Sequence, residues 1–279
     1  MELNIFQSLI LGLLSGLAEI LPVSGQAHRM IFLKLFGAEG EHPFLRLMIH
    51  MATVFALHYS CRHHIVRMMR AQRLALIPKR RRKRPLDVQA LMDFNLLKTT
   101  LVPIVLAFIF HSAIRAMGGG LLLVAAGLVI NGLILYIPQY LPGSNKESGD
   151  MNRLDGLIFG LGGAASTLPG ISCVGTAVSI GSVRGMELDY ALKLALVMNI
   201  PVNLGFILYD VLEIFSAGVS GFSFSLLLGS LLAAAAVFVG IISGMRLMKK
   251  ITERFGYSVF ALYSWGAALM AFVIYLMVV

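Results

Sequence analysis

Four side chains capable of acid–base or anion-binding chemistry lie close together near the start of the chain. The stretch Glu19-Ile-Leu-Pro-Val-Ser-Gly-Gln-Ala-His28 carries a carboxylate, a hydroxyl, a carboxamide and an imidazole between the apolar runs 9–17 and 30–36. Polar and ionisable side chains are costly inside a bilayer, so in a membrane segment they indicate a functional site. The proline and glycine of this stretch break helices, and broken backbone at membrane depth is tolerated only where protein buries it or where it lines a wet cavity.

A second stretch, Thr167-Leu-Pro-Gly-Ile-Ser-Cys-Val-Gly-Thr176, repeats part of this pattern. In both stretches a Leu-Pro pair is followed by a serine, Ser24 in the first and Ser172 in the second. Two interrupted apolar segments at corresponding positions in two halves of a chain are the sequence feature that best locates the binding site of an inverted-repeat membrane protein. We therefore treat the two stretches as parts of one site.

Glu19 is the candidate for the central catalytic role. An unpaired buried carboxylate is costly, so Glu19 should face a wet pocket, a cation or a basic partner, where it could hold a metal ion or act as a base. The structural alternative is a carboxylate that hydrogen-bonds to broken backbone. His28 is a candidate general acid–base, or a phosphate ligand when charged, and its structural alternative is a hydrogen bond between helices.

Ser24 and Ser172 are candidates for contacts with phosphate, because helix N-termini beside the two breaks would present free N–H groups and the positive end of a helix dipole. Serine is also common where membrane helices pack closely, which is the structural alternative. Gly170 and Thr176 belong to the second stretch and join Ser172 as substrate-binding candidates.

Two arginines adjoin the stretches and could bind an anion. Arg29 directly follows the first stretch and could contact phosphate or extend toward lipid headgroups. Arg184 follows the second stretch and could reach an anionic ligand or mark the membrane interface. Asn199 and Asn203 flank Pro201 in an apolar run, and we expect them to make hydrogen bonds between helices.

The composition places this chemistry in a membrane. Hydrophobic residues make up 58% of the 279 residues and charged residues 13%, and the mean hydropathy is +0.83. Soluble domains carry about 25% charged residues, so the sequence predicts an all-α polytopic membrane protein. The two cysteines, Cys61 and Cys173, form neither a disulfide framework nor a metal-binding pattern.

The positive charge of the chain, formally +9, is concentrated between residues 61 and 94. A basic segment of this kind could contact nucleic acid, but a cytoplasmic loop beside anionic lipid headgroups explains it better. We therefore expect membrane lipids, and no nucleic acid, among the partners.

The helices that must position the site follow from the lengths of the apolar runs, since a spanning helix needs about 20 residues. The first stretch falls in a helical hairpin over residues 4–36, and the second in a hairpin over residues 154–187. A polar linker, 139–153, divides a first repeat, 1–138, from a second repeat, 154–279. Six spanning helices are predicted, three in each repeat: 44–60, 95–115, 121–138, 190–212, 222–245 and 257–278.

Placing the basic loop 61–94 in the cytoplasm fixes the topology. For 44–60 to run inward, the preceding residues must enter and leave the membrane on the outer side. For 190–212 to run outward, residues 154–187 must enter and leave on the cytoplasmic side. Both polar stretches therefore lie on re-entrant hairpins that enter from opposite faces. Three spans per repeat give the halves opposite topology, so the two breaks should meet near mid-membrane.

The first stretch, extended to Gly16-Leu-Ala-Glu-Ile-Leu-Pro-Val-Ser-Gly-Gln-Ala-His28, resembles the first signature of the undecaprenyl-pyrophosphate phosphatase family of the bacitracin-resistance type. Leu168-Pro-Gly-Ile-Ser-Cys-Val-Gly-Thr176 resembles its second signature, and the segment order is similar over the whole chain. The resemblance implies six spans with two opposed re-entrant hairpins. It also implies that the protein removes a phosphate from undecaprenyl pyrophosphate at the outer face of the bacterial plasma membrane, with a divalent cation, Mg²⁺ or Ca²⁺. This reaction recycles the lipid carrier of cell-wall precursors.

The chain departs from the family pattern at four positions. Ser15 stands where the family carries the first of two glutamates, and Gly25 stands for the second of two serines. In the second signature, which reads serine-arginine-serine in the family, Cys173 stands for the arginine and Val174 for the second serine. Phosphoryl transfer depends on cations that clamp the transferring group. Both the phosphate clamp and the metal site should therefore be weaker unless Arg29 or Arg184 substitutes.

Three hypotheses follow. The first is a membrane phosphatase acting on undecaprenyl pyrophosphate or a related polyprenyl pyrophosphate, in which Glu19, His28 and Ser24 have catalytic roles. The second is a transporter or lipid flippase that uses the same cavity without hydrolysis, and the third is a catalytically impaired homologue that only binds. The sequence favours the first hypothesis and allows, without requiring, a homodimer.

Overall fold

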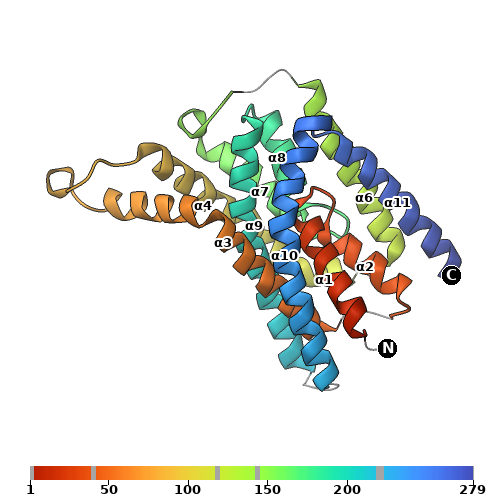
Figure 1. Cartoon of the computed structure of the whole chain (residues 1–279). Helices are drawn as coiled ribbons and strands as arrows, with labels where there is room; N and C mark the ends of the chain where they lie inside the picture. Colours follow the sequence, from red (N-terminus) through yellow and green to blue (C-terminus); the bar gives the residue numbers. More distant parts are fainter. Residues whose placement is uncertain (1–2, 39–41, 117–119, 142–144, 218–222, 279) are drawn as a thin grey trace.

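The computed structural model describes residues 3–38, 42–116, 120–141, 145–217 and 223–278, and all regular elements in these ranges are helices (Figure 1). Six of these helices are long and apolar enough to cross a membrane, which confirms the prediction of an all-α polytopic membrane protein. They are α3 (Pro43–Ala75), α4 (Val88–Ile109), α6 (Leu121–Tyr136, continued by the 3-10 turn η2, Ile137–Tyr140), α9 (Leu188–Ala217), α10 (Phe224–Phe255) and α11 (Val259–Val278).

Four shorter helices form the two interrupted segments. The first break separates α1 (Ile5–Ile20) from α2 (Gly25–Leu35), and the second separates α7 (Arg153–Ala165) from α8 (Cys173–Val183). Both breaks fall at the proline-containing turns that the sequence predicted. The remaining short elements are η1 (Lys79–Arg81), α5 (His111–Ala116) and η3 (Ser148–Asp150).

α7 and α8 form a hairpin whose two ends lie together. The N–H of Lys146 donates to the carbonyl of Gly185 at 3.1 Å, and the N–H of Glu187 donates to the carbonyl of Lys146 at 3.1 Å. In Figure 1 the N-terminus and the start of α1 lie near one end of the bundle, and this hairpin lies toward the other end. The depth of the two hairpins in a bilayer and the division into two inverted repeats stay predictions. Of the expected linker, residues 142–144 lie outside the described residues.

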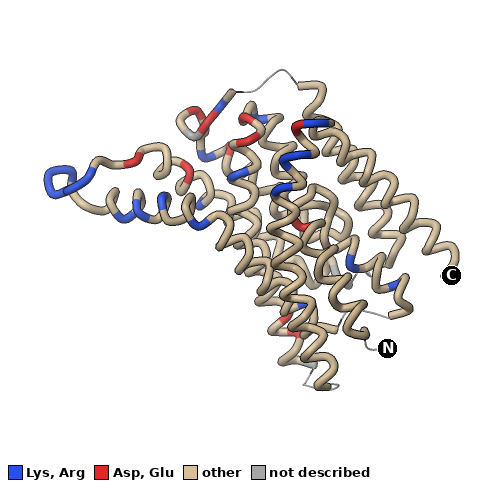
Figure 2. The backbone as a smooth tube through the Cα atoms, viewed as in Figure 1, with Lys and Arg blue, Asp and Glu red and all other residues tan. Residues whose placement is uncertain are grey.

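The basic segment 61–94 differs from its prediction as a loop. α3 continues past the predicted end to Ala75, and α4 begins already at Val88. Together these helix ends form an arm that projects from the bundle, with basic residues gathered at its tip (Figure 2). Hydropathy shows where a helix leaves the apolar layer, whereas capping residues show where a helix begins or ends. Here the Asp87 carboxylate accepts the N–H of Ala90 at 3.0 Å and caps the start of α4. The cytoplasmic position of the arm stays a prediction.

α1 packs against α10 through small residues. Gly12 and Gly16 of α1 face α10, and Gly240 of α10 faces α1. A Cβ atom built on Gly16 would overlap the carbonyl group of Val237. Small residues let membrane helices approach closely enough for extensive van der Waals contact. This contact fixes α1, and with it the last turn that carries Glu19, against a long helix.

A single buried side chain links the two helix breaks. Asn131 of α6 is fully buried, and its Nδ2 donates to the carbonyl of Pro22 at 3.0 Å. Its Oδ1 accepts the N–H of Ser172 at 2.9 Å, and Nδ2 also lies 3.0 Å from the hydroxyl of Ser264 on α11. The carboxamide therefore satisfies one backbone group from each break and holds the two breaks beside each other.

Replacing Gly16 by alanine should destabilise the fold, because the added methyl group would meet the backbone of Val237. Extra atoms in a well-packed core typically cost about 1–3 kcal/mol. We expect the Tm of the detergent-solubilised protein to fall for Gly16→Ala. The control is Gly266→Ala on α11, where a Cβ atom would meet open space and the Tm should be kept. Equal Tm values for the two variants would contradict the close contact.

Replacing Asn131 by leucine, which has a similar size, should also destabilise the protein. The carbonyl of Pro22 and the N–H of Ser172 would lose their partner, and a stranded buried polar group costs about 1–3 kcal/mol. Thermal unfolding in detergent measures the effect, with Asn145→Leu at an exposed position as the matched control. A wild-type Tm for Asn131→Leu would show that the breaks do not depend on this side chain.

Candidate functional site

The two helix breaks border one cavity of about 380 Å³. Glu19 and Ser24 line it from the first break, and Ser172 and Cys173 line it from the second. The structure thus brings four of the residues that the sequence singled out to one cavity, although the two breaks lie far apart along the chain: Glu19, Ser24, Arg29 and Ser172. Further lining comes from α3 and α9, the two helices that pack beside the breaks.

Glu19 lies in the last turn of α1 and is held by neutral partners. Its Oε1 accepts hydrogen bonds from Nδ2 of Asn199 at 2.9 Å and from Nδ2 of Asn203 at 3.1 Å. These asparagines of α9 make the inter-helix hydrogen bonds that were expected of them, and their partner is the candidate carboxylate. The other oxygen, Oε2, lies against Gly25, since a Cβ atom built there would be 2.7 Å away from it.

A serine caps each helix that begins at a break. Ser24 is the N-cap of α2, and its hydroxyl accepts the N–H of Ala27 at 3.4 Å. Ser172 is the N-cap of α8, and its hydroxyl accepts the N–H of Gly175 at 3.2 Å. Each hydroxyl still has its own hydrogen to donate. Because the first residues of both helices also line the cavity, two positive helix ends face the same space.

Ser24 adopts a backbone conformation that residues other than glycine rarely take. Its φ is 65°, which makes it the one described residue other than glycine with positive φ. Left-handed backbone costs free energy for a residue with a Cβ atom, and such strain persists only where the surroundings impose it, often at functional sites. The turn after Pro22 therefore holds Ser24 at the start of α2.

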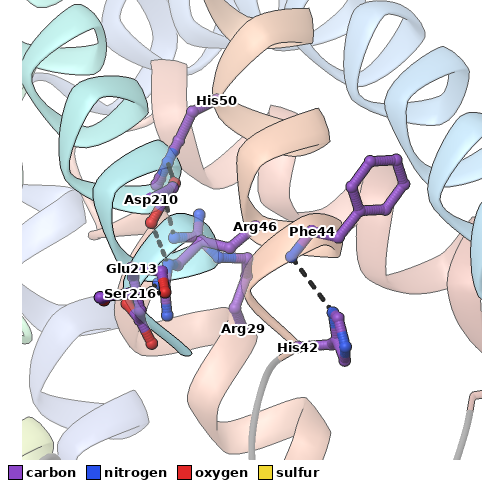
Figure 3. A network of polar contacts seen from close by, with 8 residues as sticks. All are labelled: Arg29, His42, Phe44, Arg46, His50, Asp210, Glu213 and Ser216. Atoms are coloured by element: carbon purple, nitrogen blue, oxygen red, sulfur yellow. Dashed lines mark hydrogen bonds and ion pairs between the residues drawn. The ribbon is translucent and has the colours of Figure 1, made fainter. Parts of the chain in front are cut away.

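A network of charged side chains lines another part of the cavity (Figure 3). Arg29, 4% exposed, has a terminal guanidinium nitrogen 3.3 Å from Nε2 of His50, and Nδ1 of His50 lies 2.7 Å from Oδ2 of Asp210. Arg46 donates from Nε to Oδ1 of Asp210 at 2.5 Å and from its terminal nitrogen to Glu213 at 2.5 Å. The sequence predicted only Arg29 here. For Arg46, His50 and Asp210 the available signal was an ionisable side chain in a predicted spanning segment.

His28 does not lie at the cavity. Its Nδ1 is 2.9 Å from the carbonyl of Ser24, and its Nε2 is 2.9 Å from the hydroxyl of Tyr263 on α11. The ring is 4% exposed and is absent from the lining of the cavity within the described part of the chain. This geometry corresponds to the second interpretation of His28, a hydrogen bond between helices, and gives no contact for a role in acid–base catalysis.

Three further candidates are also absent from the described lining of the cavity. Arg184 ends α8 and donates from Nε to Asp155 at 2.6 Å. Thr176 is buried in the first turn of α8. Gly170 forms the turn itself: its φ is 93°, and a Cβ atom there would lie 2.7 Å from the backbone of Gly127. These residues shape or anchor the second hairpin.

The carboxylate of Glu19, which lines the cavity, could supply an oxygen ligand to a hard divalent cation. Within the described ranges no group of three or more His, Cys, Asp or Glu side chains is placed to hold a metal ion. Mg²⁺ usually keeps several waters and binds through one or two carboxylates together with substrate phosphates. The Glu19 carboxylate could take part in that mode, and the described residues do not form a complete protein site for the metal.

Comparison with known proteins agrees with the motifs. The family model described as bacitracin resistance protein BacA matches residues 8–270. The undecaprenyl-diphosphatase of Methanobrevibacter smithii is 28% identical over 277 residues, which is 97% of each chain. That of Bifidobacterium longum strain DJO10A is 27% identical over 96% of this chain and 93% of its own. Undecaprenyl-diphosphatase 1 of Shouchella clausii is 26% identical over 97% of this chain and 96% of its own.

The match runs through both helix breaks and nearly all of the helices around the cavity, and the relatives align over almost their full length. This chain therefore belongs to the bacitracin resistance protein BacA family.

Proposed function

We propose that this multi-pass membrane protein removes the terminal phosphate of undecaprenyl pyrophosphate. The names of its relatives support the substrate class. The observation that carries the proposal is the cavity between the breaks, where two serine-capped helix N-termini and the carboxylate of Glu19 face the same space. Helix N-termini with free N–H groups are natural binding sites for phosphate.

In this proposal the chain's own groups orient the pyrophosphate. The hydroxyls of Ser24 and Ser172 donate to phosphate oxygens, since each already accepts a backbone N–H and keeps its hydrogen for another acceptor. The helix ends at Gly25 and Cys173 add partial positive charge. Donors fixed before the reaction stabilise the charge that develops on the transferring group without reorganising.

Glu19 is the base in this proposal. A water molecule attacks the terminal phosphorus, its proton passes to Glu19, and the bond from that phosphorus to the bridging oxygen breaks. The products are inorganic phosphate and undecaprenyl phosphate. The amides of Asn199 and Asn203 fix the carboxylate without neutralising its charge. A divalent cation held by Glu19 and the phosphate oxygens would supply further charge neutralisation.

Transport without hydrolysis is the second candidate function. The observation that favours it is the neutral thiol of Cys173 in the cavity, at the position where the resemblance expects an arginine. With less cationic stabilisation, a bound pyrophosphate would react more slowly. Movement of the lipid between the leaflets of a vesicle with no release of phosphate would support this function over the first.

Replacing Glu19 by glutamine should abolish most of the phosphate release. The amide keeps the shape of the side chain but cannot accept the proton, and loss of a general base typically costs about 100- to 10,000-fold in rate. The measurement is phosphate release from undecaprenyl pyrophosphate by the purified protein, with and without Mg²⁺ or Ca²⁺. Glu253→Gln, at an exposed position of α10, is the matched control.

Two outcomes would overturn parts of this account. Absence of release from the wild-type protein would remove the phosphatase function. Undiminished release from Glu19→Gln would keep the function but remove the base that we assign.

We also propose that the protein lies in the bacterial plasma membrane with the arm in the cytoplasm and the cavity accessible from the outer side. A Cys61→Ala, Cys173→Ser background with Asn145→Cys should then react with an impermeant maleimide only in inverted vesicles. Gly120→Cys, expected on the outer side, should react only in right-side-out vesicles. The opposite labelling pattern would reverse the orientation.

A further inference from the structure

The arm carries most of the net charge of the protein. Residues 61–94 contain ten Lys or Arg and two Asp, so they account for +8 of the formal charge of +9. One of the aspartates, Asp87, pairs with Arg67 at 2.5 Å, and the other, Asp93, is 2% exposed. At the tip, residues 79–84 are six consecutive basic residues, five of which are exposed. The arm therefore presents a positive surface whose charge its own carboxylates do not balance.

One face of α3 within the arm combines apolar with basic side chains. At intervals of four, three and four residues, which place side chains in one row along a helix, this face carries Arg62, Val66, Met69 and Arg73. All four are exposed, Val66 by 50% and Met69 by 44%. A different face is used inside the arm, where Met68 packs in one cluster with Ala90 of α4. We call the four exposed side chains the outer row.

Two features place the start of the outer row at the level of the lipid headgroups. A spanning helix needs about 20 residues, whereas α3 has 33, so α3 leaves the hydrocarbon layer before it ends. Tyr59, three residues before the row, is 48% exposed, and the guanidinium of Arg62 lies over its ring, 4.4 Å from the centroid. Tyrosine is enriched where membrane proteins meet the headgroups, and arginine extends its charge toward them.

The direction of the arm keeps the rest of the outer row near the same surface. In Figure 1 α10 runs along the length of the bundle, whereas the arm points sideways from it. Figure 2 shows Lys and Arg along the arm and at its tip. Because the long helices cross the bilayer, a segment that points sideways at headgroup level runs along the membrane surface. The bundle thus holds the arm beside lipid, and contact between them is an intramolecular event in effect.

A bilayer surface fits this combination of side chains better than a soluble polyanion does. Anionic headgroups attract Lys and Arg within a Debye length of about 10 Å. The apolar pair Val66 and Met69 can enter the boundary between headgroups and acyl chains, as in interfacial amphipathic helices. Proteins that bind single-stranded nucleic acid add aromatic side chains for stacking on bases, and residues 61–84 contain no Phe, Tyr or Trp.

We propose that the arm binds an anionic bilayer surface, with the basic tip 79–84 on lipid phosphates and Val66 and Met69 at the boundary with the acyl chains. The ligand is the membrane that the bundle crosses, so this inference does not depend on the proposed phosphatase function. The bound arm holds one end of α3, whose other end lines the cavity at Arg46 and His50.

The test places a fluorescent reporter on the outer row of the full-length protein. In the Cys61→Ala, Cys173→Ser background, Met69→Cys is labelled with bimane, and the protein is placed in nanodiscs that contain a lipid with a nitroxide at the headgroup. Quenching should be at least about twofold stronger with phosphatidylglycerol present than in phosphatidylcholine alone. Salt should remove the difference, since the Debye length falls to about 3 Å at 1 M. Asn145→Cys, exposed outside the arm, should respond to neither change.

Variants test the charged and the apolar contacts separately. Val66→Asp should lower the quenching in phosphatidylglycerol, because anionic lipid repels a carboxylate at this boundary. Removal of the tip charge should lower it to the level found in phosphatidylcholine, in the sixfold variant Lys79→Gln, Arg80→Gln, Arg81→Gln, Arg82→Gln, Lys83→Gln, Arg84→Gln. The matched control removes exposed basic residues of α10 and should keep the quenching: Lys249→Gln, Lys250→Gln, Arg254→Gln. Thermal unfolding of each variant shows that it is folded.

Equal quenching in the two lipid mixtures, or quenching that the sixfold variant leaves unchanged, would overturn the inference. Titration of single-stranded RNA and of polyglutamate against the protein in phosphatidylcholine nanodiscs addresses other occupants. If either binds wild type but not the sixfold variant, while phosphatidylglycerol does not increase the quenching, the arm is a site for a soluble polyanion and the lipid assignment fails. Phosphate release is not measured, so these results stand whether or not the protein is a phosphatase.

Discussion

The arrangement of the whole protein depends on how two interrupted helices satisfy their backbone groups. A break leaves N–H and C=O groups without helical partners, and the bilayer core supplies no water to replace them. Asn131 pairs with one such group from each break, and Ser24 and Ser172 cap the helices that follow. The polar cavity is a consequence of this requirement, because the groups that stabilise broken backbone also attract an anion.

Two charged side chains that line the cavity, Glu19 and Arg29, contact different neighbours. Glu19 is supported by carboxamides of α9, so its charge is retained rather than balanced by an arginine. Arg29 contacts the imidazole of His50, which in turn contacts the carboxylate of Asp210.

The sequence alone located the helix breaks and the membrane spans, because these depend on local features: proline–glycine turns and the length of apolar runs. It also brought Glu19, Ser24 and Ser172 to one site through the repeated motif. It could not identify Asn131 or the contact between His50 and Asp210, since these depend on partners more than a hundred residues away. For the same reason the sequence could not decide between catalysis and a hydrogen bond between helices for His28, the last residue of the first stretch, whose Nε2 lies 2.9 Å from the hydroxyl of Tyr263. The sequence did not predict that α3 and α4 extend into the arm, because a cluster of charged residues does not show where a helix is capped.

The absence of a side chain at Gly25 has an evolutionary consequence. The space that a Cβ atom would occupy there lies against Oε2 of Glu19, while the same carboxylate is anchored through its other oxygen by two amides. A side chain introduced at this position alone would require the carboxylate to shift relative to those amides. The effect of a substitution at Gly25 therefore depends on the side chains that hold Glu19, which makes mutations at these positions epistatic.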